Sequence, residues 1–195
     1  MKNNKSPGPD GFPIEFFRQN SEYWLQKLHA LFNLVYNTST YPDEWAEGII
    51  IPIFKSGDSN KPNNYRPITL TSCLSKVFCS ILNKRLIDWT EKNCPIAEGQ
   101  AGFREGHSTM DNIFILDTIV KKMLMRRRSK LYCIFIDFKK AFDTVPRALL
   151  WIKMQENNYQ GKMLKMLKSI YETVKCAVAL NGNKRTSFFY LRARS

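Results

Sequence analysis

The chain has 195 residues, of which 44% are hydrophobic and 13% aromatic, a composition that suits a folded protein and excludes a disordered one. Thirty Lys and Arg against 17 Asp and Glu give a formal net charge of +13. That charge favours polyanionic partners, nucleic acid first and anionic membrane second. The alternative is a solvated basic surface without a specific partner.

Other classes of protein are disfavoured by what the sequence lacks. No apolar run approaches the roughly 20 residues of a membrane-spanning helix, and residues 1–5 have no signal-peptide core, so we expect an intracellular protein without a membrane partner. The five cysteines are an odd number without a Cys-x-x-Cys pair, which is typical of free thiols and not of a disulfide framework or a zinc site. His29 and His107 are too isolated to build a metal cluster.

The first half of the chain is predicted to alternate helices with one β-hairpin. Apolar residues at spacings of three and four indicate the helices, and Pro52 suggests an edge position for the first strand. The expected elements are a turn at 7–11, a short helix after Pro13, a helix capped by Ser21 that ends at 37–42, strands at 49–54 and 65–70, and a helix around 74–82 that stops near 93–95.

The second half begins with a basic, glycine-punctuated stretch at 99–106. The expected elements are a helix capped by Thr109, a buried strand at 131–136, a helix after Pro146, a helix at about 162–171, and a hairpin with arms 174–180 and 185–191 around Asn181-Gly182. Asn-Gly supplies the positive φ angles of a tight hairpin turn. The whole pattern predicts a mixed α+β fold.

Residues 134–143 carry the most chemical information. The apolar run at 131–136 ends in the carboxylate of Asp137, as where a buried strand delivers a metal ligand to the rim of a sheet. Phe142 stands five positions further on. The alternatives are a solvated acid at a strand end for Asp137 and an ordinary core aromatic for Phe142.

Four separated segments, in order along the chain, resemble the reverse transcriptases of non-LTR (LINE-type) retrotransposons. They are Lys5-Ser6-Pro7-Gly8-Pro9-Asp10-Gly11, then Ile51-Pro52-Ile53-Phe54-Lys55 with Gly57-Asp58 and Asn64-Tyr65-Arg66-Pro67-Ile68, then Gln100-Ala101-Gly102-Phe103-Arg104 continuing to Ser108-Thr109, and Asp137 with Ala141-Phe142-Asp143. The resemblance implies a partial right-hand polymerase fold, with fingers at about 1–107 and 146–195, the start of the palm at about 108–145, and no thumb.

The resemblance also implies an activity, RNA-directed DNA synthesis on an RNA template and a DNA primer, with deoxynucleoside triphosphates and two Mg²⁺ ions. It makes Asp137 the first catalytic metal ligand and the carbonyl of Phe138 its neighbouring ligand. It makes Phe142 a steric gate that collides with the 2′-hydroxyl of a ribonucleotide. Asp143 fits a structural role before the next helix equally well.

Basic and aromatic residues match the family's contacts to polyanions. Arg66 and Arg104 would contact the triphosphate or the template backbone, Lys55 is a weaker candidate, and Phe103 would pack near the template or into the palm. A dense basic run also fits an RNA-facing surface or a nuclear targeting patch, and consists of Lys121, Lys122, Arg126, Arg127, Arg128 and Lys130. Each of the basic side chains is alternatively only a solvated cation.

Two departures and one missing motif limit what the resemblance implies. His107 stands where relatives commonly carry arginine, and Cys79 where they carry an acid, which weakens the case for fully functional fingers. The family's second catalytic motif has adjacent aspartates, and no Asp-Asp pair occurs in this sequence. We therefore expect a truncated fragment in which the second metal site cannot be completed, and which binds nucleic acid without polymerising.

In the family, the hairpin that carries the adjacent aspartates lies next to the strand expected here at 131–136, so its absence has a further consequence. We expect an unpaired palm edge there, with uncovered apolar surface and self-association. The family implies a nuclear location. The alternative to an enzyme fragment is a non-enzymatic, basic nucleic-acid-binding or interaction relic.

Overall fold

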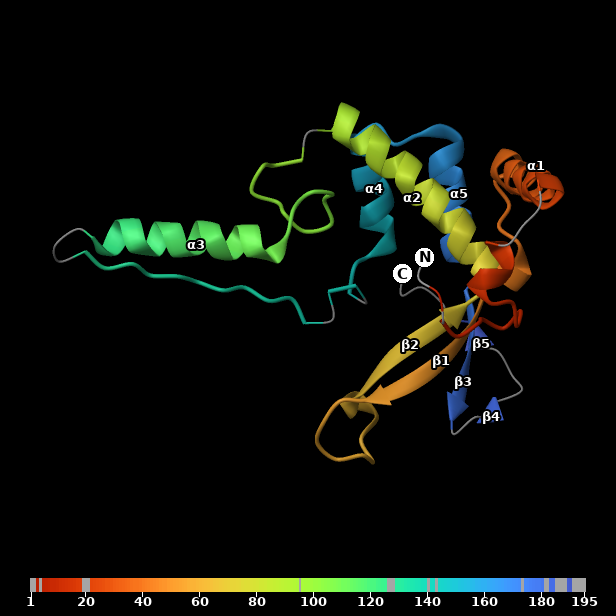
Figure 1. Ribbon diagram of the computed structural model, residues 1–195, viewed down its shortest axis with the longest axis horizontal. Coiled ribbons are helices and arrows are strands. Elements are labelled where there is room, and N and C mark those ends of the chain that lie inside the picture. The colour runs from red at the N-terminus through yellow and green to blue at the C-terminus, as the bar shows by residue number, and fades with distance from the viewer. Residues whose placement is uncertain are drawn as a thin grey trace. The chain divides into compact units, whose positions relative to one another are not determined.

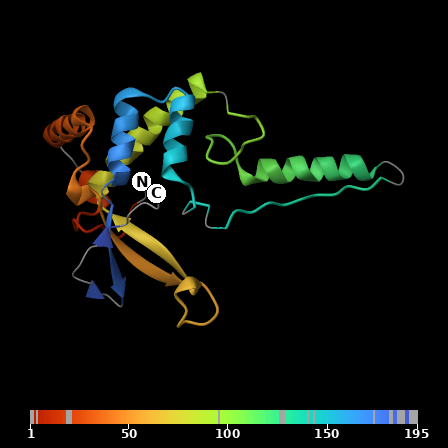
Figure 2. The ribbon, with the colours of Figure 1, turned by 180° about the vertical axis from the view of Figure 1, so that it is seen from behind.

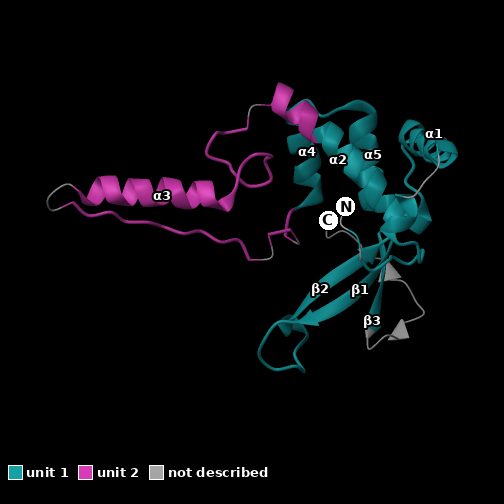
Figure 3. Ribbon diagram, in the orientation of Figure 1, with its two compact units in different colours: residues 1–86, 146–195 teal, residues 87–145 magenta. Residues whose placement is uncertain are grey.

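The structure is a computed structural model of the chain, and it describes residues 3, 5–18, 22–94, 96–125, 129–139, 141, 142, 144–172, 174–180, 183, 184, 189 and 190. These residues form helices and one mixed sheet, so the expected α+β composition is confirmed. The chain divides into two compact units, residues 1–86 with 146–195 and residues 87–145 (Figure 3). No helix among the described residues is long and apolar enough to span a bilayer.

Most elements of the first unit lie where the sequence predicts them (Figure 1). They are η1 (Ile14–Phe17), α1 (Glu22–Thr38), η2 (Asp43–Trp45), β1 (Glu47–Phe54), η3 (Pro62–Asn64), β2 (Tyr65–Thr71), α2 (Cys73–Asn93, which continues into the second unit), α4 (Arg147–Glu156), α5 (Gly161–Glu172), β3 (Lys175–Leu180), β4 (Asn183–Lys184) and β5 (Phe189–Tyr190). Ser21 and the turn residues Asn181 and Gly182 lie outside the described residues.

The two predicted hairpins join into one sheet. β1 pairs antiparallel with β2, with Ile53 opposite Arg66, and parallel with β3, with Ile50 opposite Val178. β3 in turn pairs antiparallel with β4 and β5, which confirms the final hairpin. The sheet order is β2-β1-β3-β4, so β1 is central and its expected edge position is wrong.

Pro52 is tolerated in this central strand because of the register. It faces Pro67 on β2, and the Lys55 N–H donates to the Asn64 carbonyl at 2.9 Å three residues further on. Hydrogen-bonded and non-bonded pairs alternate along an antiparallel ladder. The two prolines therefore form a non-bonded pair, and neither removes a hydrogen bond between β1 and β2.

The core of the first unit is built around aromatic rings from α1, α2 and the turn between α1 and β1. Its buried members are Val35, Tyr41, Trp45, Ala46, Phe78, Leu82 and Met166. The Tyr41 hydroxyl lies 2.6 Å from Ser75 Oγ, which satisfies a polar group that is otherwise surrounded by apolar side chains. Burial raises the pKa of Tyr41 above its usual range.

Close backbone contact docks the N-terminal turn on the junction of β2 and α2. A Cβ atom at Gly8 would lie 2.3 Å from the carbonyl oxygen of Thr71, so only glycine fits there. Gly11 has a φ of +71°, a conformation that glycine adopts without strain. The turn predicted at residues 7–11 is thus packed against backbone far along the chain.

The second unit contains α3 (Thr109–Leu124), which begins one residue earlier than predicted. Ser108, not Thr109, is the capping residue, because the Asp111 carboxylate accepts a hydrogen bond from the Ser108 N–H at 2.7 Å. A carboxylate in the first turn also complements the positive end of the helix dipole.

The buried strand expected at residues 131–136 is wrong. This segment forms no strand and runs back alongside α3 in both ribbon views (Figures 1 and 2). Ile134, Phe135 and Ile136 are 86%, 79% and 78% exposed. An apolar run becomes a buried strand only where neighbouring strands and helices cover it, and among the described residues none pairs with this segment. The uncovered apolar surface that we expected here is confirmed.

Candidate functional site

The candidate residues fall in both units. Asp137 follows the exposed segment of the second unit, and its side chain is exposed. Phe138, beside it, is 76% exposed. The Asp137 carboxylate therefore lies on an exposed segment without regular secondary structure, and not at the end of a buried strand as the sequence predicted.

Magnesium requires about six oxygen ligands in octahedral geometry. The Asp137 carboxylate and the Phe138 carbonyl are oxygen donors of the right kind for it. Within the described part of the chain, however, no three His, Cys, Asp or Glu side chains gather into a group that could hold a metal ion. These residues thus supply the type of ligand that magnesium prefers but too few of them, and they form no complete site by themselves.

Phe103 and Phe142 meet in the second unit. Their ring centroids lie 6.1 Å apart and the rings are edge to face, at 89°. Edge-to-face pairs of this separation are favourable. Both rings remain accessible, at 90% and 82%, so Phe142 is not the core residue considered as an alternative. The contact joins two segments that the sequence analysis singled out separately; Asp143, next to Phe142, lies outside the described residues.

Arg104 turns toward the end of α2. Its Nε lies 3.5 Å from Oε1 of Glu91, and its Nη2 donates to Oε2 of the same carboxylate at 3.5 Å. The arginine side chain is only 17% exposed, and among the described residues its Nε has no hydrogen-bond partner. Sequence reasoning identified Arg104 but missed Glu91, which has no motif of its own.

Lys55 and Arg66 share one face of the β1–β2 hairpin. Arg66 faces Ile53 across the ladder, and Lys55 follows two positions after Ile53. Side chains two positions apart along a strand lie on the same face, so the two cations are diagonal neighbours. Both are exposed, which gives the hairpin a basic surface.

Lys121 and Lys122 lie in the last turn of α3, where positive charge favours the helix dipole. Lys121 Nζ is 2.7 Å from Asp117 Oδ2, one turn earlier, in an exposed pair of the kind that contributes little to stability. Both side chains are exposed. Arg126, Arg127 and Arg128 lie outside the described residues.

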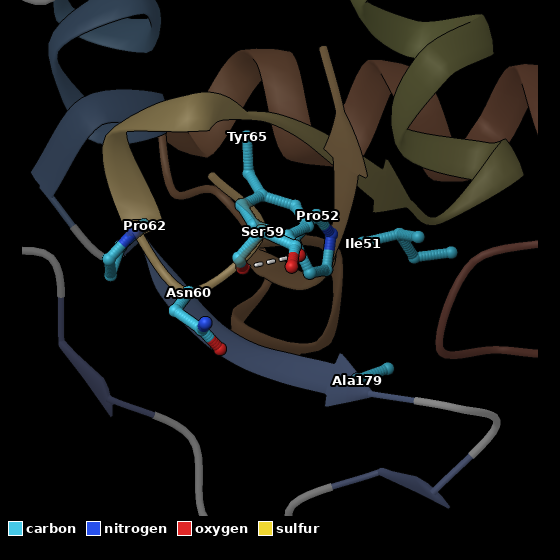
Figure 4. Close-up of a pocket in the computed structure, with 7 residues that line it drawn as sticks. All are labelled: Ile51, Pro52, Ser59, Asn60, Pro62, Tyr65 and Ala179. Carbon is cyan, nitrogen blue, oxygen red and sulfur yellow. Dashed lines mark hydrogen bonds between the residues drawn. The ribbon is translucent and has the colours of Figure 1, made fainter. Parts of the chain in front are cut away.

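The sequence analysis missed a cavity of about 710 Å³ beside the β1–β2 hairpin. Pro52, Tyr65 and Ala179 are among the residues that line it (Figure 4). The prolines and the tyrosine were visible in the sequence. The parallel pairing that brings β3 beside β1 was not, since the two strands are more than a hundred residues apart.

The comparison with known families decides the family. Residues 53–194 match the model described as reverse transcriptase (RNA-dependent DNA polymerase). The chain belongs to the reverse transcriptase family. Its curated relatives come from non-LTR retrotransposons, as the sequence motifs predicted.

Three relatives illustrate how far the similarity extends along this reverse transcriptase chain. The probable RNA-directed DNA polymerase from transposon X-element of Drosophila melanogaster is 32% identical over 93% of the chain. The one from transposon BS is 33% identical over 72%, and the polymerase from the mobile element jockey is 28% identical over 92%, both also from Drosophila melanogaster. The chain spans 20%, 16% and 20% of these relatives, that is, about a fifth of their length.

Proposed function

We propose that this chain is the fingers and the start of the palm of an RNA-directed DNA polymerase from a non-LTR retrotransposon. Its support is the family match at 53–194, which includes Arg66, Arg104, Asp137 and Phe142. In this proposal residues 1–107 and 146–195 are the fingers, and 108–145 begin the palm. The template is RNA, the primer DNA, and the substrates are deoxynucleoside triphosphates.

The candidate residues take the roles that the family implies. Asp137 is the first catalytic carboxylate and, with the Phe138 carbonyl, a magnesium ligand of the complete domain. Phe142 excludes the 2′-hydroxyl of ribonucleotides, and its accessible ring is available for contact with a sugar. Arg66 and Arg104 contact the triphosphate or the template backbone, since a guanidinium group forms bidentate hydrogen bonds with phosphate oxygens.

The remaining basic residues bind nucleic acid without reading its sequence. Lys55 lies beside Arg66 on the hairpin, and Lys121 and Lys122 project from the end of α3. Arg126, Arg127 and Arg128 complete this group, and Phe103 adds an aromatic contact to the nucleic acid. Cations placed along an extended surface release counterions from the phosphates that they contact, which is the main source of sequence-independent affinity.

A polypeptide of these 195 residues binds nucleic acid but does not extend a primer, because two-metal transfer needs carboxylates beyond Asp137. Primer extension with magnesium or manganese tests this, and the product should not exceed that of Asp137→Ala. Extension that disappears in Asp137→Ala would show that the 195 residues suffice for catalysis. The proposed nuclear location is tested separately, by imaging the tagged chain in cells.

Salt dependence tests the binding role. The logarithm of the affinity for single-stranded RNA should fall with the logarithm of the salt concentration, with a slope of roughly −0.7 per phosphate neutralised. Arg66→Gln should make this slope smaller by roughly 0.7, whereas Lys165→Gln, an equal loss of charge on the exposed side of α5, should leave it unchanged. Binding that ignores salt contradicts the role. Binding without extension by the complete domain would favour the non-enzymatic alternative.

A further inference from the structure

The cavity beside the β1–β2 hairpin is used by none of the roles above. It measures about 710 Å³ and lies wholly in the first unit. Figure 4 shows the hydrogen bond between Tyr65 and Ser59, with Asn60 and Pro62 of the hairpin loop on one side and Ala179 of β3 on the other. It is large enough for a ligand of nucleotide size, since typical small-molecule sites measure about 300–1,000 Å³.

The cavity exists because β1 and β3 part at Pro52. The last parallel pair is Ile50 with Val178. Pro52 forms a non-bonded pair with Pro67, so its backbone nitrogen points away from β2, toward β3, and carries no hydrogen to donate. Pairing with β3 cannot continue past this position, and the loop after β1 folds beside the opening.

The lining suits a flat heterocycle. Two contacts fix the Tyr65 ring: its hydroxyl donates to the Ser59 carbonyl at 2.9 Å, and the Phe54 ring packs 5.4 Å from it. Pro52 and Pro62 add apolar surface, and the Asn60 side chain adds a donor and an acceptor. A fixed aromatic ring with polar groups at the wall is the arrangement that stacks a base and contacts its edge.

The charges nearby select a polyanion. Lys61 is exposed in the hairpin loop, and Lys55 and Arg66 are exposed on the face of the hairpin opposite to that of Tyr65, because neighbouring residues of a strand point to opposite faces. The carboxylate at this end of the hairpin is Asp58, whose Oδ1 accepts the Asn60 backbone N–H at 2.9 Å, whereas Glu47 lies at the far end of β1. A phosphate backbone could therefore follow the hairpin while one of its bases enters the cavity. A free apolar ligand or an apolar peptide would gain nothing from these cations.

We propose that this cavity holds one base of a single-stranded nucleic acid, stacked on Tyr65, with the adjoining phosphate on Lys61 and the phosphates further along the strand on Lys55 and Arg66. The inference rests on the proposed function and deepens it, because it names a base-binding site on the proposed fingers. In the proposed reaction the strand is the RNA template. The site accepts any base, since stacking on an aromatic ring depends little on sequence.

The test compares a short oligouridylate with an abasic oligomer of the same length, which has the phosphates but no bases. The full chain should bind the oligouridylate more tightly than the abasic strand. Tyr65→Leu should weaken oligouridylate binding roughly 5- to 150-fold, the range that corresponds to loss of one stacked base. It should change neither the binding of the abasic strand nor the salt slope, because it removes no phosphate contact.

Three controls separate stacking from damage to the fold. Tyr65→Phe keeps the ring without the hydrogen bond to Ser59 and should retain the preference for bases. Tyr23→Leu removes an exposed tyrosine from α1 and should bind like the wild type. A strand that carries 5-iodouridine should form its photocrosslink at Tyr65 in the unaltered chain, which needs no substitution at all.

The outcomes distinguish this site from the function on which it rests. Equal affinity for the two strands, or equal behaviour of Tyr65→Leu and Tyr23→Leu, overturns the base site and leaves nucleic-acid binding intact. Failure to bind either strand at low salt overturns both. Uridine monophosphate that competes as well as the oligomer would make the cavity a free-nucleotide site and overturn the single-strand proposal. An oligodeoxyuridylate bound more tightly than the RNA would assign the site to DNA instead of the template.

Discussion

The carboxylate of Asp10 accepts a hydrogen bond from the backbone N–H of Cys73 at 3.2 Å, across 63 residues of chain. Cys73 is the first residue of α2, and the first N–H groups of a helix have no partner within it. The N-terminal turn thus supplies a cap to the helix that carries Phe78 into the core. The conspicuous Pro-Gly-Pro-Asp-Gly segment is explained by this docking.

Loss of this cap should destabilise the first unit. Asp10→Ala removes the carboxylate and should lower the free energy of unfolding by roughly 0.5–2 kcal/mol, as for other helix caps. Gly8→Ala should cost more, because its Cβ would overlap the backbone of Thr71. Urea unfolding followed by circular dichroism measures both.

A glycine with open space around it provides the control. An added Cβ at Gly99 meets nothing within 4 Å, so Gly99→Ala should change the stability by no more than about 0.5 kcal/mol. If the urea midpoint of Gly8→Ala equals that of Gly99→Ala, the turn is not packed as closely against Thr71 as the structure indicates.

The fold was predictable wherever local pattern decides it. The spacing of Leu25, Leu28, Phe32 and Val35 gives α1, whose Val35 is buried. Asn181-Gly182 gives the final hairpin. In each case the signal lies within one element or one turn, so neighbours in space were not needed to find it.

Long-range pairing was not predictable in the same way. From the sequence alone, Pro52 suggests an edge strand, because the register that lets a central strand tolerate it is not visible there. The pairing of β1 with β3 is not visible either, since β3 comes from a distant part of the chain. The run at 131–136 has the composition of a buried strand, yet composition does not supply the neighbours that would bury it. For the site, motifs identified Phe103 and Phe142, but their contact and the cavity depend on tertiary structure.

The cysteines should react in an order set by their burial. Burial raises the pKa of Cys73, Cys79 and Cys176, whereas Cys133 is exposed. The thiolate is the reactive form, so near neutral pH iodoacetamide should modify Cys133 at least roughly tenfold faster than these three. Peptide mass spectrometry over time gives the rates.

The pH dependence of the same groups has a definite sign. A thiol whose pKa is higher in the folded state holds its proton more tightly there, so the stability that it contributes is complete below its unfolded pKa. That contribution should be lost as the pH rises past the ordinary thiol value of 9.0. Cys79→Ala should weaken this alkaline loss of stability, while Cys133→Ala should leave it unchanged. Uniform labelling rates at all the cysteines would refute the burial on which both expectations depend.

The apolar segment of the second unit should promote self-association. Ile134 and Ile136 are both exposed, and exposed apolar segments recruit other chains. The double change Ile134→Ser and Ile136→Ser should shift sedimentation toward the monomer without altering the charge. Leu25→Ser with Leu34→Ser, two exposed leucines of α1, is the matched control and should have little effect. A chain that is already a monodisperse monomer before any substitution would contradict the prediction.

The gate role of Phe142 can be measured only where nucleotides are incorporated, so the residue is changed after residues 99–146, which include both Phe103 and Phe142, are grafted into a complete polymerase of the family. Phe142→Ala should open space for a 2′-hydroxyl. A clash of this kind typically costs about 1–3 kcal/mol, which predicts a loss of selectivity against ribonucleotides of roughly 5- to 150-fold. Single-nucleotide incorporation with paired ribo- and deoxynucleotides measures the ratio.

Phe103→Ala is the informative companion, because its ring meets that of Phe142 edge to face. If the contact fixes the gate, Phe103→Ala should reduce the selectivity in the same direction but by less, and the double variant should lose less than the sum of the two. Phe138→Ala removes an equally exposed ring without touching the gate and should preserve the ratio. Selectivity that is unchanged in Phe142→Ala, with incorporation of deoxynucleotides intact, would show that this ring is not the gate.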